Sequence, residues 1–475
     1  MRDLFVALFV LTALPISFKR PVVGILTFSL LAYMRVQDLA WGFARFERWS
    51  LYVALAMLAG YAVQRDKQGP IWTVRTGLLL FMPAWTFIGL VVAIGSKAFQ
   101  SANFVEYCKV IFIAIFTMMV VRTRAHLRAL MWVIGGSFAF FGLKNGAAAV
   151  LSGGSLYIIR GPGGMLEDNN DFAMALAMSI PVIVGLATSE VNPYYQRWLK
   201  LFVPFTYMAI LATRSRGGFL AAGLATFILV WRSRNRVAGL LLMALAGIVG
   251  LSLLPPEMFE RLKTLKDVQA DGSAMGRLAA WRIAGEMIQD HPIFGVGFNQ
   301  FQRRYLDYGV AVGTATGTRV AHNGYLQIWS EAGTPVFLAY FALLVLSVLA
   351  VQRIRREAKR VFDRSWIFSY CTAFEGTILV FMLGSMFLNR AHFDLIYHYF
   401  AIVMVFERVA REEMRSPMVA APVRTGVGGG PLVRREPFGF GRRASPGRGF
   451  RRTQLMPRVL RRGSGTGIAD RTEGA

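Results

Sequence analysis

The sequence predicts an all-α protein that crosses a membrane about 12 times and carries one large, mainly helical loop outside it. Hydrophobic residues make up 55% of the 475 residues, charged residues only 17%, and the mean hydropathy is +0.45. Apolar stretches close to the roughly 20 residues that a helix needs to cross a bilayer recur along the chain. Because these stretches are continuously apolar and do not alternate, a membrane β-barrel is not expected.

The apolar segments predict the membrane helices in chain order. The first two are short and separated only by Lys19, Arg20 and Pro21, so they form either a hairpin or one broken element, and the count is 12 or 13. The segments are residues 4–18, 21–34, 48–64, 76–95, 105–121, 127–151, 171–189, 199–213, 217–231, 237–254, 335–352, 366–388 and 394–409.

This pattern divides the chain into four parts. Residues 1–254 hold the N-terminal membrane helices, 255–334 a large periplasmic loop domain, and 335–410 the C-terminal membrane helices. Residues 411–475 contain 14 Arg, no Lys and five acids among many Gly and Pro, which predicts a disordered cytoplasmic tail. The net charge of +26 therefore indicates attraction of this tail to anionic lipid rather than a nucleic-acid partner.

The basic residues predict which loops face the cytoplasm. One set of short connections holds 17 Lys and Arg, and the opposite set holds eight. Since cytoplasmic loops carry the excess of positive charge, the first set and the tail are cytoplasmic. Residues 255–334 then fall on the outer side, which in a Gram-negative cell is the periplasm. Eight acids cancel eight Lys and Arg there, so this domain is not a simple electrostatic patch.

Two stretches of the loop domain predict helices. GRLAAWRIAGEMIQDHPIFGVGFNQF has helical spacing in its first half, and Pro and several Gly break its second half. In VAHNGYLQIWSEAGTP, Asn323, Gln327 and Glu331 are spaced by four along one polar face, which we expect to form a wall of the site. Gly333 ends that helix, Thr334 can cap the next one, and Pro335 suits its first turn.

Arginines gather at membrane boundaries on the predicted outer side, against the usual charge rule. A guanidinium group matches the geometry of a phosphate or diphosphate better than an ammonium group does. Two simpler explanations stay open: snorkelling of Arg214 and Arg216, and a cation–π contact between Arg277 and Trp281 on one helix face. The residues are Arg160 in IIRGPGG, Arg214 and Arg216 in TRSRGG, Arg277 and Arg282 in GRLAAWR, and Arg319 in TRVAHN.

His322 is the strongest candidate for a catalytic group, because it follows Arg319 and precedes a membrane-anchored helix. Neutral imidazole can take a proton from a sugar hydroxyl. The acidic run from Asp168 to Asp171 is interpreted as a helix N-cap. No P-loop, dinucleotide-binding glycine pattern or Asp-x-Asp metal motif occurs, so neither a cofactor nor a metal is expected. The other histidines, interpreted as structural, are His126, His291, His392 and His398.

Three motifs together resemble the O-antigen ligase and polymerase superfamily of bacterial envelope proteins. They are the SRGG turn, the GR...W...HPIFGVGFNQF stretch, and AHNGYLQIWSEAGTPVF. The single large outer loop most resembles the ligases, and residues 1–34 are similar to O-glycosylation ligases that accompany exosortase systems. The resemblance covers residues 1–410. One departure is GTP after Glu331, where the family more usually has Gly-hydrophobic-Gly.

The resemblance implies an inverting, metal-independent glycosyltransferase without a cofactor, in lipopolysaccharide maturation at the periplasmic face of the inner membrane. The donor is a glycan on undecaprenyl diphosphate, the acceptor is lipid A-core or another hydroxyl, and membrane lipids surround both. The family's histidine maps onto His322 and its arginines onto Arg216 and Arg277. Weaker diphosphate-binding candidates are Arg282, Arg319 and Arg160.

Three alternatives remain open at this point. An O-antigen polymerase would use the same chemistry on another lipid-linked glycan, and a protein O-oligosaccharyltransferase would use a protein hydroxyl. A polysaccharide or lipid transporter would place charges near mid-membrane, and Lys144 and Glu375 both lie inside apolar runs.

Overall fold

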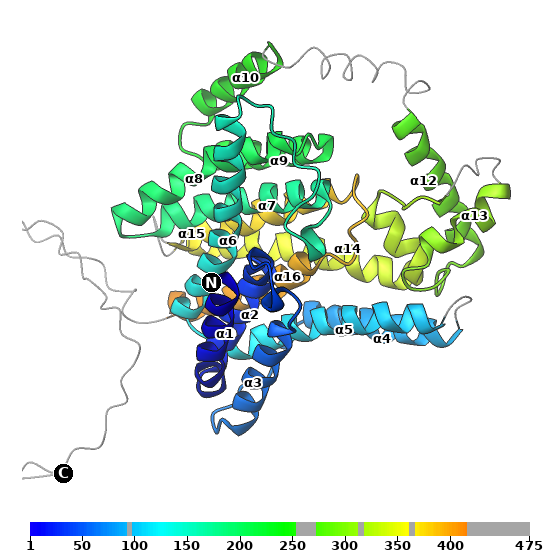
Figure 1. The fold of residues 1–475 in the computed structure, drawn as a ribbon, viewed down its shortest axis with the longest axis horizontal. Helices are drawn as coiled ribbons and strands as arrows, with labels where there is room; N and C mark the ends of the chain where they lie inside the picture. The colour runs from blue at the N-terminus through cyan, green and yellow to red at the C-terminus, as the bar shows by residue number, and fades with distance from the viewer. Residues whose placement is uncertain (93–96, 253–271, 312–317, 361–365, 416–475) are drawn as a thin grey trace, which may run out of the picture. The chain divides into compact units, whose positions relative to one another are not determined.

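The computed structural model describes residues 1–92, 97–252, 272–311, 318–360 and 366–415. Within these ranges every regular element is a helix, and the only strand-like pairing is one bridge between Arg160 and Asp168 (Figure 1). The predicted all-α membrane protein is confirmed. Six of the described helices are long and apolar enough to cross a bilayer, and four more are shorter apolar helices, so the count of about 12 crossings stays a prediction.

Each predicted apolar segment falls on a helix. The N-terminal helices are α1 (Arg2–Lys19), α2 (Pro21–Tyr33), α3 (Trp49–Val63), α4 (Val74–Val92), α5 (Lys97–Val120), α6 (Arg124–Leu151), α7 (Asn169–Ser189), α8 (Pro193–Ala212), α9 (Arg216–Trp231) and α10 (Arg236–Ser252). They are followed by α12 (Gly272–Asp290), α13 (Phe301–Ala311), α14 (Gly324–Ala358), α15 (Trp366–Gly384) and α16 (Asp394–Arg415). Short 3₁₀ turns are η1 (Val36–Leu39), η2 (Phe43–Arg45) and η3 (Gly164–Leu166).

Part of the predicted tail is helical. Helix α16 continues to Arg415, so the first five residues of the predicted tail are helical. Its arginines and acids explain this, because Arg411 pairs with Glu357 of α14 and with Glu407 one turn earlier. The rest of the predicted tail, and residues 255–271 and 312–317 of the loop domain, lie outside the described residues.

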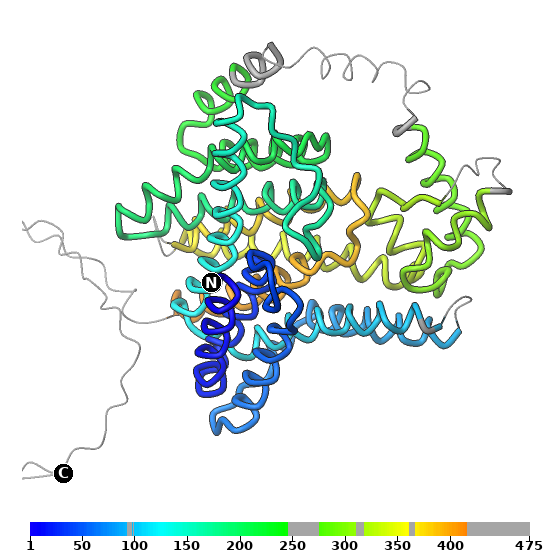
Figure 2. The backbone as a smooth tube through the Cα atoms, viewed as in Figure 1, coloured from blue at the N-terminus to red at the C-terminus, as the bar shows by residue number. Residues whose placement is uncertain are grey.

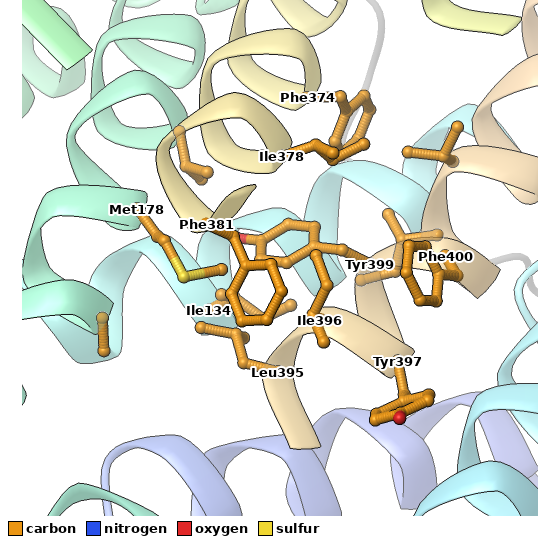
Figure 3. Close-up of a cluster of buried hydrophobic side chains, with 14 of the residues drawn as sticks. Ile134, Met178, Phe374, Ile378, Phe381, Leu395, Ile396, Tyr397, Tyr399 and Phe400 are labelled. Carbon is orange, nitrogen blue, oxygen red and sulfur yellow. The ribbon is translucent and has the colours of Figure 1, made fainter. Parts of the chain in front are cut away.

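Helix α7 lies at the centre of the apolar core. Its Ala-rich sequence lets neighbouring helices approach closely, and a β-carbon at Gly185 would lie only 2.8 Å from the Ala373 side chain of α15. Figure 3 shows how side chains from four helices meet in this core. It labels Ile134 of α6, Met178 of α7, Phe374, Ile378 and Phe381 of α15, and Leu395, Ile396, Tyr397, Tyr399 and Phe400 of α16.

Helix α14 is two helices joined at a kink. Gly333 has φ 83° and ψ 173°, a conformation that is essentially restricted to glycine. The predicted helix break at Gly333 is confirmed. Two backbone hydrogen bonds hold the 292–296 loop against the kink, from Thr334 N to Pro292 O and from Val296 N to Ser330 O, both 2.8 Å. Figure 1 shows α12 and α13 packed at this end of α14.

Ion pairs between separate segments fall into two groups among the described residues. In one group, the arginines lie in or next to the connections that are richest in Lys and Arg, and their acids lie there or on the neighbouring helices: Arg75–Glu407, Arg124–Glu413, Arg128–Glu190, Arg232–Glu375, Arg355–Glu375 and Arg411–Glu357. The other contains Arg390–Asp171, and at the same end His392 Nε2 lies 3.6 Å from Glu331 Oε2, a contact that is an ion pair only when the imidazole is protonated. The charged residues thus sort to the two ends of the helices in the same way as the sequence divides them.

Candidate functional site

His322 lies in a short non-helical segment immediately before α14. Its backbone has φ 48°, in the left-handed region that non-glycine residues rarely adopt. The next residue, Asn323, is the N-cap of α14, and its Oδ1 accepts hydrogen bonds from Tyr325 N at 2.9 Å and Leu326 N at 3.1 Å. The cap determines where α14 starts, and it therefore also holds the backbone of His322, the residue before it, in its strained conformation. Such strain is typical of functional sites.

Helix α12 supports the backbone of this segment. The indole Nε1 of Trp281 donates a hydrogen bond of 3.1 Å to the carbonyl oxygen of Ala321. Ala321 is fully buried in a small apolar cluster, together with Ala280 and Ala284 of α12. The sequence placed Arg277 and Trp281 on one helix face, and the structure turns this face toward the His322 segment.

Three charged residues act on the His322 imidazole. Partial burial lowers the pKa of His322 from its ordinary value of 6.5, and the nearby guanidinium groups of Arg277 and Arg319 lower it further, while the Asp168 carboxylate raises it. Arg319 also lies against Gly276, where a β-carbon would collide with its guanidinium group. Near neutral pH the imidazole is therefore unprotonated and has two arginines beside it.

Figure 2 shows the long loop between α6 and α7, and Asp168 at its end acts electrostatically on His322. The loop folds back on itself, because Arg160 bridges to Asp168 and Gly161 N donates to Glu167 O at 2.8 Å. Asp168 is the N-cap of α7, as predicted, and its Oδ1 accepts from Asn170 N at 2.8 Å. The Arg160 backbone thus lies next to the carboxylate that acts on His322, and its exposed side chain is at the surface.

The TRSRGG turn lies against the same loop. Asn169 Nδ2 donates to Thr213 O at 3.1 Å, and Ser215 Oγ donates to Asn170 Oδ1 at 2.7 Å. Ser215 also caps α9, of which Arg216 is the first residue, with an exposed side chain. Gly218 lets α7 approach closely, because a β-carbon there would lie 2.6 Å from the Ala173 side chain of α7.

Arg214 has a different environment from Arg216. Its backbone has φ 52°, and its guanidinium carbon lies 5.0 Å from the ring centre of Tyr157. A cation–π contact at the surface therefore accounts for Arg214.

The polar face of the first half of α14 points inward, so the expectation that it forms a site wall is wrong. Gln327 and Glu331 are only 4% and 2% exposed. Gln327 Oε1 accepts from Ala391 N, and Glu331 Oε1 accepts from Phe301 N, each at 3.2 Å. These side chains bind loops to α14, because buried backbone N–H groups need partners.

The connection between α15 and α16 completes this end of the helices. Gly324 N donates to Ser385 O at 2.7 Å, and Arg390 forms an ion pair with the buried Asp171 at the start of α7. The sequence offered no signal for the Arg390–Asp171 pair, because the two residues are 219 positions apart.

Arg282 is placed least favourably among the predicted diphosphate ligands. It lies five residues after Arg277, which is about 140° around an α-helix, and its side chain is exposed. Arg277 and Arg319 are half-buried beside His322, and Arg216 and Arg160 are exposed in the loops bonded to Asp168 and its neighbours.

Among the other histidines, His398 is structural as expected. Its Nδ1 lies 2.8 Å from the Tyr33 hydroxyl and its Nε2 3.0 Å from the Thr117 hydroxyl, and it is buried. In the part of the chain that the structure describes, no three His, Cys, Asp or Glu side chains gather as a metal site.

Comparison with known families gives two matches. Residues 201–341 match a family described as O-antigen ligase, and this range contains His322 and four of the five candidate diphosphate-binding arginines, all except Arg160. Residues 1–190 match a family of unknown function (DUF5935). The chain matches none of the curated proteins.

Proposed function

We propose a lipid-linked glycan transfer for this chain, which belongs to the O-antigen ligase and polymerase family. The observation that carries the proposal is the approach of Arg277 and Arg319 to a half-buried His322 with a lowered pKa, all within the matched residues. A neutral base beside permanent positive charge is what transfer from a diphosphate to a hydroxyl requires.

In the proposed reaction, His322 accepts the proton of the acceptor hydroxyl. The hydroxyl oxygen attacks the sugar carbon that carries the diphosphate, the carbon–oxygen bond to the diphosphate breaks, and the configuration at that carbon inverts. Arg277 and Arg216 hold the diphosphate and stabilise the charge that it gains as it leaves, with Arg319 and Arg160 beside them. General-base catalysis contributes about 10² to 10⁴ in rate, and one well-placed electrostatic donor about 10² to 10³.

The donor we propose is a glycan on undecaprenyl diphosphate, and the acceptor is the hydroxyl of lipid A-core. A long prenyl chain fits a site at the end of apolar helices, because the chain can stay in lipid while the diphosphate reaches the arginines. The charge asymmetry of the connections supports an inner-membrane location with this site toward the periplasm. We propose that the reaction needs no metal, so EDTA should leave the rate unchanged.

The transporter alternative receives less support. Glu375 pairs with Arg232 and Arg355 and is 2% exposed, so its place inside an apolar run has a structural explanation. The resemblance to exosortase-associated ligases stays a prediction.

The test is transfer by the purified full-length protein in liposomes, supplied with a polyprenyl diphosphate-linked oligosaccharide and lipid A-core. We expect glycan on lipid A-core without added metal or nucleotide. Longer lipid-linked chains with no transfer to lipid A-core would identify a polymerase, and glycan on an added periplasmic protein would identify a protein transferase. If the donor is not consumed with any acceptor, glycan transfer is contradicted.

A further inference from the structure

A cavity of about 330 Å³ lies at the far end of α12 from the His322 site. Polar and apolar side chains line it together, so it differs from the apolar surface of a membrane helix. Four of the lining residues are titratable or charged: Asp290, His291, Arg304 and Tyr308. The apolar part includes Val92, Ile293, Phe294 and Val296.

Hydrogen bonds and ring stacking hold the loop that forms the cavity wall. The indole Nε1 of Trp85 in α4 donates to Ile293 O at 3.1 Å, and the Trp85 ring stacks on Phe294 with centres 5.3 Å apart. On the other side, the bond from Val296 N to Ser330 O ties the same loop to α14. Because two helices hold the loop, the cavity is formed before any ligand binds, as is usual for small-molecule sites.

The polar groups of the cavity can both donate and accept hydrogen bonds. Burial, and then the Asp290 carboxylate to which the hydroxyl donates, raise the pKa of Tyr308, so the hydroxyl stays protonated and its oxygen can accept a further hydrogen bond. Arg304 pairs with Asp307 through Nη1 at 2.9 Å, and a guanidinium group has five N–H donors in all. Asp290 supplies carboxylate oxygens as acceptors, and Phe294 supplies an aromatic surface.

This combination suits a saccharide. Sugar hydroxyl groups need both donors and acceptors, and the apolar faces of sugar rings pack against aromatic side chains. A prenyl chain has no polar groups that could bond to the remaining N–H donors of Arg304 or to the Asp290 carboxylate. The opposite charges of Asp290 and Arg304 favour a neutral sugar over an anionic one.

The position on α12 separates this cavity from the reacting atoms. Arg277 and Asp290 are thirteen residues apart on one helix, which corresponds to about 20 Å at 1.5 Å per residue. A sugar in the cavity is therefore not the sugar that reacts at His322, but belongs further along the same glycan chain.

We propose that the cavity lined by Asp290, Arg304, Tyr308 and Phe294 is an accessory saccharide site that holds a neutral glycan segment distal to the reacting sugar. This inference rests on the proposed function. The segment comes from either the donor glycan or the acceptor core, which share this chemistry.

The test is direct binding to the full-length protein in nanodiscs, measured by calorimetry with two separate probes. One is the free oligosaccharide released from the lipid-linked donor by mild acid, and the other is the lipid-free core oligosaccharide. We expect one probe to bind. Tyr308→Phe and Arg304→Gln should each lower the affinity for that probe about tenfold, which is the effect of one lost hydrogen bond to a charged or buried group. The exposed neighbour Gln302→Ala is the control and should bind like wild type.

The outcomes separate this inference from the proposed function. If neither probe binds, or if folded Tyr308→Phe and Arg304→Gln with wild-type melting temperatures bind as tightly as wild type, the accessory site is wrong. His322→Ala should keep probe binding and lose transfer. A protein that binds a probe through the cavity but transfers no glycan would overturn the proposed function and leave the saccharide site standing.

Discussion

His322 owes its properties to residues that are remote in the sequence. The motif around it identified the residue, but its environment comes from Trp281, Arg277 and Asp168, of which Asp168 is 154 positions away. The sequence predicted Asp168 as a helix cap, and that role is confirmed, yet its electrostatic effect on His322 depends on a loop fold that no periodicity reveals. For Gln327 and Glu331, the sequence showed that they share one helix face, but it did not show that this face points into the protein.

The pH dependence of transfer tests the environment of His322. A base must be neutral to act. Because the pKa of His322 is lowered, the fall of kcat/KM on the acidic side of its pH profile should lie below pH 6.5. Arg277→Ala removes a positive neighbour and should move the limb to higher pH. Asp168→Asn removes a negative neighbour but can still cap α7, and it should move the limb to lower pH.

The control for these shifts is Glu167→Gln, which changes an exposed acid one residue from Asp168. Its profile should overlay that of wild type. Shifts of Arg277→Ala and Asp168→Asn in the same direction would contradict the assignment of charges around His322.

The bond from Trp281 to Ala321 predicts a positioning role. Trp281→Phe keeps an aromatic ring and removes the N–H donor, so the backbone before His322 loses one hydrogen bond, worth about 1 kcal/mol. We expect kcat to fall severalfold with KM unchanged, since the donor contacts are intact. Trp329→Phe removes a comparable bond to Thr334, away from His322, and serves as the control. An equal loss of kcat in both variants would indicate a general loss of packing and not a role of Trp281 in positioning His322.

At the scale of elements, apolar runs were enough to find the membrane helices. Each run lies on a helix, because a continuously apolar segment satisfies all its backbone hydrogen bonds within itself only as an α-helix. Helix α13 was missed, because the glycines and the proline before it indicated only a broken region. The break at Gly333 was predicted from Gly and Pro, whereas the loop that clamps it could not be, because that loop comes from residues 292–296.

The clamp makes Gly333 sensitive to substitution. Gly333→Ala would force a side chain into a glycine-only backbone conformation and toward the carbonyl oxygen of Ile293, so we expect a loss of about 3 kcal/mol or more of unfolding free energy. Thermal melting in detergent would measure it. Gly285→Ala is the matched control in α12, where a β-carbon meets nothing within 4 Å, and it should be neutral or slightly stabilising. Similar melting of the Gly333 variant and wild type would argue against the clamp.

At the scale of the whole molecule, charge pairing ties the helices together at the end with the most basic connections. Glu375 is the most buried acid of this end among the described residues, and it holds Arg232 of one connection and Arg355 of α14 together. The sequence showed only an acid in an apolar run, and so could not distinguish a structural pair from a transport residue.

Removing the Glu375 carboxylate should lower the stability of the protein and leave the rate of glycan transfer unchanged. Glu375→Gln leaves two arginines without their anion, and breaking a buried pair costs about 3–5 kcal/mol. We expect a clearly lower melting temperature and a normal transfer rate per folded molecule at low temperature. Glu106→Gln is the control, because its pair with Lys109 is 72% and 62% exposed and worth little. A Glu375→Gln protein of normal stability that had lost its activity would favour a functional role for Glu375.

The single-turnover rate of glycan transfer by His322→Ala, with donor and acceptor saturating, tests most directly whether His322 is the base. The same measurement on Arg277→Ala tests whether Arg277 helps to hold the diphosphate. We expect folded His322→Ala and Arg277→Ala each to lose about 10² or more in rate, while Arg282→Ala, on another face of α12, stays close to wild type. Full transfer by folded His322→Ala would contradict the role of His322 as the base.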